Sequence, residues 1–132
     1  DPETQPVLMR LDSDLVDLVE AGVNGTLDKV DAEWTKKAAV GVVLASAGYP
    51  ESSSKGDVIT GLDQLPAGVK AFHAGTAETD GQIVTNGGRV LCITALGESV
   101  EAAQQAAYAG VDKVSFEGGF CRRDIGWRAI GR

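Results

Sequence analysis

The sequence predicts an α+β domain in which short antiparallel strands are flanked by helices. Three observations point to this class. Residues 7–24 repeat apolar side chains with a helical period, residues 39–96 hold short apolar runs separated by turn dipeptides, and residues 99–113 form a second, alanine-rich helical pattern. At 132 residues the chain is long enough for one domain with a hydrophobic core.

The first expected helix covers residues 7–24. Its apolar side chains lie on one stripe: Val7, Leu8, Leu11, Leu15, Leu18 and Val19. Asn24 and Gly25 follow, and these residue types commonly end helices. The stripe needs a partner surface, so we expect it to drive self-association when the partner is missing. The polar residues 28–37 are interpreted as a junction.

The strand pattern occupies the middle of the chain. Four apolar runs are expected to form strands: residues 39–45, 69–73, 82–85 and 89–96. The dipeptides Asp80-Gly81 and Asn86-Gly87 separate the last three runs, and both tolerate the positive φ angles of tight hairpin turns. The sequence therefore predicts a small antiparallel meander.

The second expected helix covers residues 99–113. Ser99 is suited to cap its first turn, and Glu101 complements the positive end of the helix dipole. The apolar face is built from small residues: Val100, Ala103, Ala107 and Val111. Such a face can pack closely against a sheet.

The composition excludes some function classes. A net charge of −7 argues against general binding to nucleic acid or to anionic membranes. No run of about 20 apolar residues predicts a transmembrane helix, and no basic and then apolar leader suggests secretion. Because the chain begins with Asp1 rather than Met, we expect it to be a piece of a longer protein.

The two cysteines suggest reduced thiols rather than a disulfide or a zinc site. Cys92 lies in an apolar run, where a buried thiol acts as a small hydrophobe. Cys121 precedes two arginines, which favour a lowered thiol pKa. The single histidine, His73, lies far from both in sequence. A reducing cytoplasm fits this cysteine usage best.

The strongest functional signal is a cluster of arginines. Four of the twelve cations fall in the final eleven residues: Arg122, Arg123, Arg128 and Arg132. The planar guanidinium suits phosphate and carboxylate, so this cluster predicts an anion site. Two alternatives remain open at this point, namely a solvated basic tail and arginines that pair with the protein's own acids, such as Arg123 with Asp124 or Glu117.

Three other segments carry candidate residues. Residues 1–5 place two carboxylates, a hydroxyl and an amide together, which suits either a helix cap or a site for an amine or a divalent metal. Residues 48–57 are typical of a mobile solvent loop that presents Lys55, and they do not match a Walker-type phosphate loop. His73 ends a strand and is either structural or an acid, base or ligand.

The order of several motifs resembles one enzyme family. They are Asp-Pro-Glu-Thr-Gln-Pro at 1–6, Gly-Tyr-Pro at 48–50, Lys-Gly-Asp-Val-Ile at 55–59, Phe-His-Ala-Gly-Thr at 72–76, Thr-Asn-Gly-Gly-Arg-Val-Leu at 85–91 and Arg-Arg-Asp-Ile-Gly-Trp-Arg-Ala at 122–129. In this order they resemble phosphoribosylamine–glycine ligase, also called glycinamide ribonucleotide synthetase. The resemblance runs over essentially the whole chain and corresponds to the C-terminal part of that enzyme.

The resemblance implies an ATP-grasp ligase of purine biosynthesis. With ATP and magnesium, it joins glycine to phosphoribosylamine and yields glycinamide ribonucleotide, ADP and phosphate. Residues 1–36 would be the end of the ATP-grasp domain, and residues 37–132 would be a small β barrel or sandwich-like domain. The family's metal ligands lie upstream of Asp1, so we expect the fragment alone to bind neither ATP nor Mg²⁺ tightly and to be inactive.

The resemblance also implies roles for individual residues. By similarity to related purine enzymes, Arg122 and Arg123 would clamp the ribose 5′-phosphate, and Asp1 would face the substrate amine. Lys55, His73 and Arg128 are further possible contacts. Two guanidinium groups match a phosphate dianion in charge and orientation, so the physical reading of the arginine cluster agrees.

Overall fold

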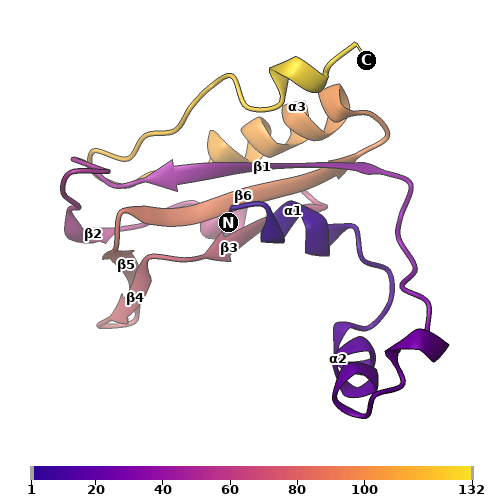
Figure 1. Cartoon of the computed structure of the whole chain (residues 1–132). Coiled ribbons are helices and arrows are strands. Elements are labelled where there is room, and N and C mark those ends of the chain that lie inside the picture. The colour runs from indigo at the N-terminus through magenta and orange to yellow at the C-terminus, as the bar shows by residue number, and fades with distance from the viewer. Residues whose placement is uncertain (1, 132) are drawn as a thin grey trace.

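The computed structural model describes residues 2–131 and contains two antiparallel sheets of three strands each (Figure 1). The first sheet has the order β1 (Ala38–Ala45), β6 (Arg89–Gly97) and β3 (Val69–His73). The second has the order β2 (Lys55–Val58), β5 (Gln82–Asn86) and β4 (Thr76–Thr79). The helices are α1 (Thr4–Met9), α2 (Leu15–Val23) and α3 (Val100–Val111), with 3₁₀ turns η1 (Leu27–Lys29), η2 (Leu62–Gln64) and η3 (Trp127–Ala129). The predicted α+β class is confirmed, and neither sheet closes into a barrel.

The hydrophobic core lies between α3 and one face of the first sheet. In β1, Val42 is fully buried and pairs with Ile93 of β6, so both side chains point toward the helix. The helix contributes Ala103 and Ala107, whose small side chains allow a close approach. The Ser99 hydroxyl accepts a hydrogen bond from the Ala102 amide at 3.1 Å, which confirms the predicted cap.

The opposite face of the same sheet is covered in part by α1. A Cβ atom at Gly41 of β1 would lie only 3.3 Å from Cδ of Pro6 in α1 and 3.0 Å from Sγ of Cys92. The first sheet is therefore the middle layer between α3 and α1 (Figure 1). This second face, and not the core face, leaves room for a pocket.

The predicted meander is wrong in one respect. Asp80 and Gly81 do form the hairpin turn between β4 and β5, with φ angles of 51° and 75°. Asn86-Gly87, by contrast, joins strands of different sheets, because β6 already pairs with β1 on one edge and β3 on the other. The chain crosses between the sheets here, and the Asn86 amide donates to the Gly75 carbonyl at 2.7 Å.

The single helix expected over residues 7–24 is also wrong, since the structure divides it into α1 and α2. The polar residues between α1 and α2 do not follow a helical hydrogen-bond pattern, and the Asp12 amide donates to the Glu33 carbonyl at 2.9 Å. The Asp14 carboxylate accepts from the Val16 amide at 2.8 Å and caps α2, while Ser13 accepts from the Glu33 amide at 2.8 Å. The end of α2 at Val23, before Asn24 and Gly25, agrees with the prediction.

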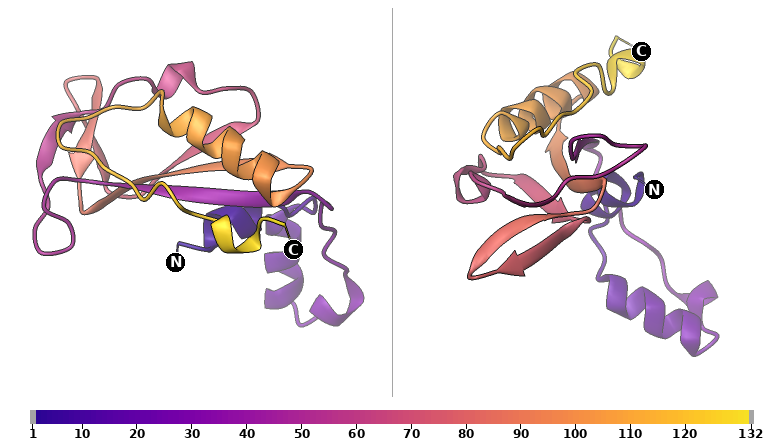
Figure 2. Two further views of the ribbon diagram at one scale, coloured as in Figure 1. Left: turned by 90° about the horizontal axis from the view of Figure 1, so that it is seen from above. Right: turned by 90° about the vertical axis from the view of Figure 1, so that its left-hand side faces the viewer.

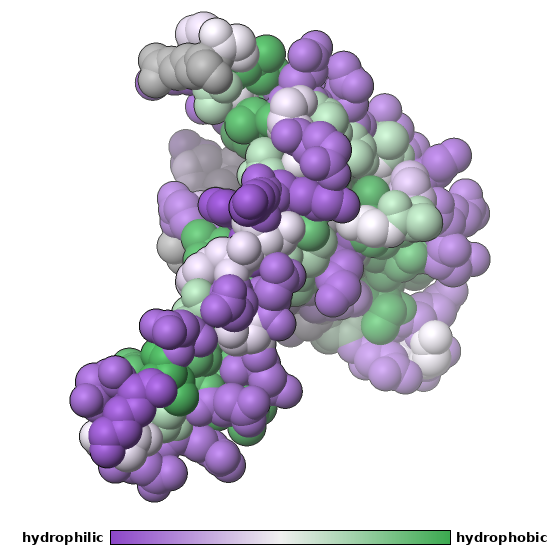
Figure 3. Space-filling model, turned by 90° about the vertical axis from the view of Figure 1, so that its right-hand side faces the viewer, coloured by the Kyte–Doolittle hydropathy of each residue, from purple (hydrophilic) through white to green (hydrophobic). Residues whose placement is uncertain are grey.

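The α2–η1 unit projects from the body of the domain (Figures 1 and 2). Apolar side chains of α2 remain in solvent, with Val16 63% exposed and Val23 82% exposed. Figure 3 shows hydrophobic surface on this projecting part at the lower left. Within the described part of the chain, no helix is long and apolar enough to cross a membrane.

Candidate functional site

A two-lobed pocket lies beside β1, between the segments from the two ends of the chain. Its lobes have volumes of about 430 and 320 Å³, within the range of small-molecule sites. Both lobes are lined by Pro2, Val43, Tyr49 and Arg89, and we call the whole the Tyr49–Arg89 pocket. The first lobe adds Gln5, Ala74, Gly75, Gly88, Leu91 and Cys92, and the second adds Gly41, Ala45, Phe120, Cys121, Arg122 and Ile125.

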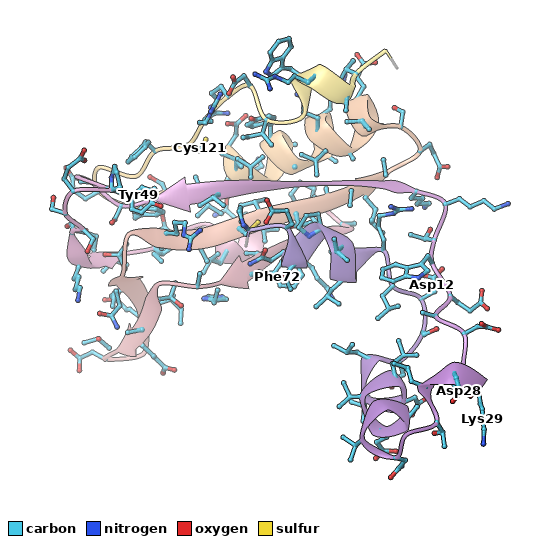
Figure 4. The ribbon with its side chains drawn as sticks, viewed as in Figure 1. Asp12, Asp28, Lys29, Tyr49, Phe72 and Cys121 are labelled. Carbon is cyan, nitrogen blue, oxygen red and sulfur yellow. The ribbon has the colours of Figure 1, made fainter. Side chains whose placement is uncertain are left out.

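The C-terminal segment forms the outer wall of the second lobe. Phe120 and Ala45 exchange two backbone hydrogen bonds, at 2.8 and 3.0 Å, so the segment joins the free edge of β1. From there it runs along β1 toward η3 (Figure 2, left). Figure 4 shows Cys121 on this segment and Tyr49 near the end of β1. This pairing brings Arg122 to the pocket.

Tyr49 is held in the shared wall by a close approach to Gly88, the residue before β6. A Cβ atom at Gly88 would collide with the Tyr49 ring, so only glycine lets the ring lie here. The hydroxyl of the fully buried Ser46 donates to the Gly87 carbonyl at 2.9 Å and fixes the start of the same loop. The segment expected to be a mobile loop therefore begins as an anchored turn, and from Lys55 it continues as β2.

Arg122 lines the second lobe and is oriented by Asp124. Its Nε and Nη2 atoms donate to the two Asp124 carboxylate oxygens at 2.9 and 2.7 Å. These hydrogen bonds raise the pKa of Arg122 and lower the pKa of Asp124. Asp124 lines a different cavity, together with Arg122, and not the pocket itself. The Asp124 carboxylate thus binds one edge of the Arg122 guanidinium without lining the pocket.

Arg123 points away from this site. Its Nη1 donates to Asp112 at 2.7 Å, and its guanidinium lies 5.6 Å from the ring centre of Tyr108 on α3. Arg123 is not among the residues that line either lobe. The structure therefore brings Arg122 to the pocket but not Arg123, and the acid partner of Arg123 is Asp112 rather than Asp124 or Glu117.

The other predicted site residues lie elsewhere. Arg128 stacks on Trp127 at 5.4 Å in η3, and His73 Nδ1 lies 3.0 Å from the Thr76 hydroxyl at an exposed position. Lys55 is exposed at the start of β2, and none of the three lines the pocket. Asp1 lies outside the described residues, although its neighbour Pro2 lines both lobes.

Cys121 lines the second lobe but is not an activated thiol. Burial raises its pKa, and this effect outweighs the opposing charge of Arg123. The lowered pKa expected from the sequence is therefore wrong. Both cysteines are free, and residues 2–131 hold no group of three or more His, Cys, Asp and Glu side chains that could bind a metal ion.

Sequence reasoning missed three residues that shape the site. Arg89 lines both lobes, and its sequence signals were its place after the Gly87-Gly88 pair and within the motif at 85–91. Tyr108 of α3 donates from its hydroxyl to the Arg122 carbonyl at 2.8 Å and accepts from the Ile125 amide at 3.0 Å. Gln104, one turn earlier, donates to the Ile125 carbonyl at 2.7 Å. Polar side chains four positions apart on an alanine-rich helix were the available signal.

Known proteins resemble this chain closely. The ligase named phosphoribosylamine–glycine ligase from Xanthomonas campestris is 57% identical over the full chain, and that from Pseudomonas aeruginosa is 59% identical. The chain spans 31% of the length of each. A crystal structure of phosphoribosylamine–glycine ligase from Thermotoga maritima matches 83% of this chain and 26% of its own, with a TM-score of 0.71 and 45% identity.

The match to a defined domain family covers most of the chain. Residues 39–128 match the family described as phosphoribosylglycinamide synthetase, C domain. These residues include both sheets except for Ala38, together with α3 and residues 120–128, and they supply most of the pocket wall. The chain therefore belongs to the phosphoribosylglycinamide synthetase C-domain family.

Proposed function

We propose that this chain supplies the phosphoribosyl-binding side of the substrate site in a longer phosphoribosylamine–glycine ligase. One observation carries the proposal. Residues from the motifs at 1–6, 48–50, 72–76, 85–91 and 122–129, which are dispersed in sequence, all line the Tyr49–Arg89 pocket. Motifs that meet at one cavity are best explained by a shared ligand.

The proposed reaction joins two small molecules. ATP would phosphorylate the carboxylate of glycine, and the amine of phosphoribosylamine would displace that phosphate to give glycinamide ribonucleotide, ADP and phosphate. In this proposal, ATP and Mg²⁺ are bound by the part of the longer protein outside residues 1–132. The pocket residues hold the phosphate ester and so fix the amine for attack.

Within the proposal, Arg122 binds the substrate phosphate and Asp1 faces the substrate amine. Arg122 offers a permanent positive charge at a partly apolar wall, where a bound phosphate is only partly hydrated. Arg123 would hold the segment that carries Arg122 against α3 through its hydrogen bond to Asp112, and so support binding indirectly. Lys55, His73 and Arg128 would need a change of position to reach the same ligand.

We further propose that residues 1–36 belong with the missing part of the protein and residues 37–132 form the domain proper. The projecting α2, with its exposed valines, supports this division. In the longer protein the preceding domain would cover α2, and in the isolated chain the same face would pair with a second copy. Two free cysteines suit a cytoplasmic location.

A second candidate is a structural domain without a ligand. It is favoured by one observation, since Arg122 and Arg123 both have carboxylate partners of their own, Asp124 and Asp112. Exposed ion pairs of this kind add little stability, so they do not by themselves explain the clustering of arginines.

Calorimetric titration of the chain with ribose 5-phosphate separates the two candidates. The ligand-binding proposal predicts saturable binding that weakens at least tenfold in the Arg122→Ala, Arg123→Ala double variant. The absence of binding, or equal binding by both proteins, would favour the structural candidate.

A second experiment tests the proposed ligase reaction. The gene including the region upstream of Asp1 is expressed, and glycine-dependent ADP release is measured with phosphoribosylamine. The isolated chain is expected to release none.

A further inference from the structure

We infer that the phosphate of the substrate is bound by Arg89 and Arg122, two arginines from distant parts of the chain, and not by the adjacent pair Arg122 and Arg123. The inference rests on the proposed function, which it makes more specific. Both arginines line the second lobe of the Tyr49–Arg89 pocket, whereas Arg123 lines neither lobe.

Arg89 sits on a firmly held piece of backbone. It begins β6, opposite Ala45 of β1, and its carbonyl accepts a hydrogen bond from the Gly75 amide at 2.9 Å. Ala45 is itself paired with Phe120 of the arginine-bearing segment. Arg89 and Arg122 are thus mounted on neighbouring strands of one hydrogen-bonded unit, which keeps their relative positions constant.

Arg122 has hydrogen-bonding capacity left for a ligand. A guanidinium carries five N–H donors in two forks. Asp124 takes the fork formed by Nε and Nη2, and among the described residues no partner is bonded to Nη1. The second fork, made by Nη1 and the remaining Nη2 proton, can therefore donate two hydrogen bonds to a phosphate while Asp124 holds the guanidinium in place.

Arg123 lacks this arrangement. Its Nη1 is bonded to Asp112, and its guanidinium lies over Tyr108. To reach the pocket it would have to give up both contacts. The role we assign to Arg123 is to position the segment that carries Arg122, in company with the two Tyr108 hydrogen bonds.

The walls of the second lobe define the class of ligand. Val43, Ala45, Phe120 and Ile125 form an apolar wall, with Arg89 and Arg122 as its cations. Such a site suits a compact organic phosphate, whose body covers apolar surface while its dianion contacts two guanidinium groups. The proposed ligand of this lobe does not need a nucleotide base. Tyr49, between the lobes, is placed to contact the body of the ligand.

Four single variants test the assignment by calorimetry with ribose 5-phosphate and, separately, inorganic phosphate. Arg89→Ala and Arg122→Ala are each expected to raise the Kd at least tenfold, while Arg123→Ala raises it less than threefold. Arg89→Lys keeps the charge without the fork and should fall between wild type and Arg89→Ala. Near-ultraviolet circular dichroism of each variant checks that the fold is intact, and Arg89→Gln replaces Arg89→Ala if that variant unfolds.

The outcomes distinguish a failure of the arginine assignment from a failure of the proposed function. If wild type binds and Arg123→Ala weakens binding as much as Arg89→Ala does, the assignment is overturned while the proposed function stands. If the wild-type chain binds neither ligand, both are overturned. Equal affinity for ribose 5-phosphate and inorganic phosphate would remove the role of the apolar wall and of Tyr49.

Discussion

Asp124 holds the guanidinium of Arg122 by two hydrogen bonds, at 2.9 and 2.7 Å, and Asp124 itself does not line the pocket. This ion pair makes the free energy of unfolding depend on pH. The pKa of Asp124 is lowered in the folded chain, so its contribution is present above the unfolded value of about 3.9 and is lost as pH falls through the lowered pKa. Urea unfolding of wild type and Asp124→Asn should differ slightly at pH 6 and converge near pH 2. A difference that persists unchanged at pH 2 would contradict this assignment.

Tyr108 is expected to control the segment that carries Arg122. In Tyr108→Phe both hydroxyl hydrogen bonds are lost, which should cost about 1–2 kcal/mol of unfolding free energy and weaken ribose 5-phosphate binding several-fold. The ring under Arg123 is retained in this variant, so Tyr108→Leu serves as the comparison that removes both contacts. Thermal unfolding and calorimetry give the two readouts. Wild-type affinity in Tyr108→Phe would show that the segment needs no anchor.

Gly88 is predicted to be intolerant of any side chain. In Gly88→Ala the new Cβ meets the Tyr49 ring, so either the ring or β6 must shift, at a cost of about 1–3 kcal/mol. Ligand affinity should fall as well, because Tyr49 lies in the wall of both lobes. Gly22→Ala is the matched control. Its Cβ has nothing within 4 Å, and alanine in α2 should raise helix stability by up to about 1 kcal/mol.

The exposed face of α2 is expected to associate in the isolated chain. Replacing Val19 and Val23, which are 56% and 82% exposed, with lysine should shift the chain toward monomer in analytical ultracentrifugation. Val58→Lys, at an exposed valine on β2, controls for the added charge. A wild-type chain that stays monomeric at millimolar concentration would contradict self-association.

Cys121 should react slowly despite its arginine neighbours. Burial raises the pKa of its thiol, so alkylation at pH 8 is expected to be slower than that of free cysteine. Because Cys121 lines the second lobe, bound ribose 5-phosphate should slow the reaction further. Mass spectrometry after a timed iodoacetamide reaction measures both effects, and unfolded protein gives the reference rate. Acceleration by the ligand would place the phosphate elsewhere.

The sequence predicted the elements that depend on local patterning. The cap at Ser99, the alanine face of α3 and the turn at Asp80-Gly81 are all specified within a few residues. The partition into two sheets was not predictable in this way. Asn86-Gly87 satisfies the local rule for a hairpin, but a strand has only two edges, and those of β6 are taken by β1 and β3.

The pocket residues also divide into those that local sequence predicts and those that depend on how the strands are arranged. Arg122 stood out because charge density is visible in sequence, and it does line the pocket. Arg89 did not, because its position depends on the crossing between sheets at Asn86-Gly87 and on the pairing of Ala45 with Phe120. Adjacency in sequence did not predict a shared environment, since Arg122 and Arg123 follow one another but contact different acids, Asp124 and Asp112.

The pairing of Phe120 with Ala45 also has a consequence for biosynthesis. The buried residues of the core end at Phe116, whereas the second lobe has no outer wall without residues 120–125. A product cut short before Phe120 would keep most of its core and lose the Arg122 side of the pocket. Ligand binding is therefore a stricter test of an intact chain than folding is.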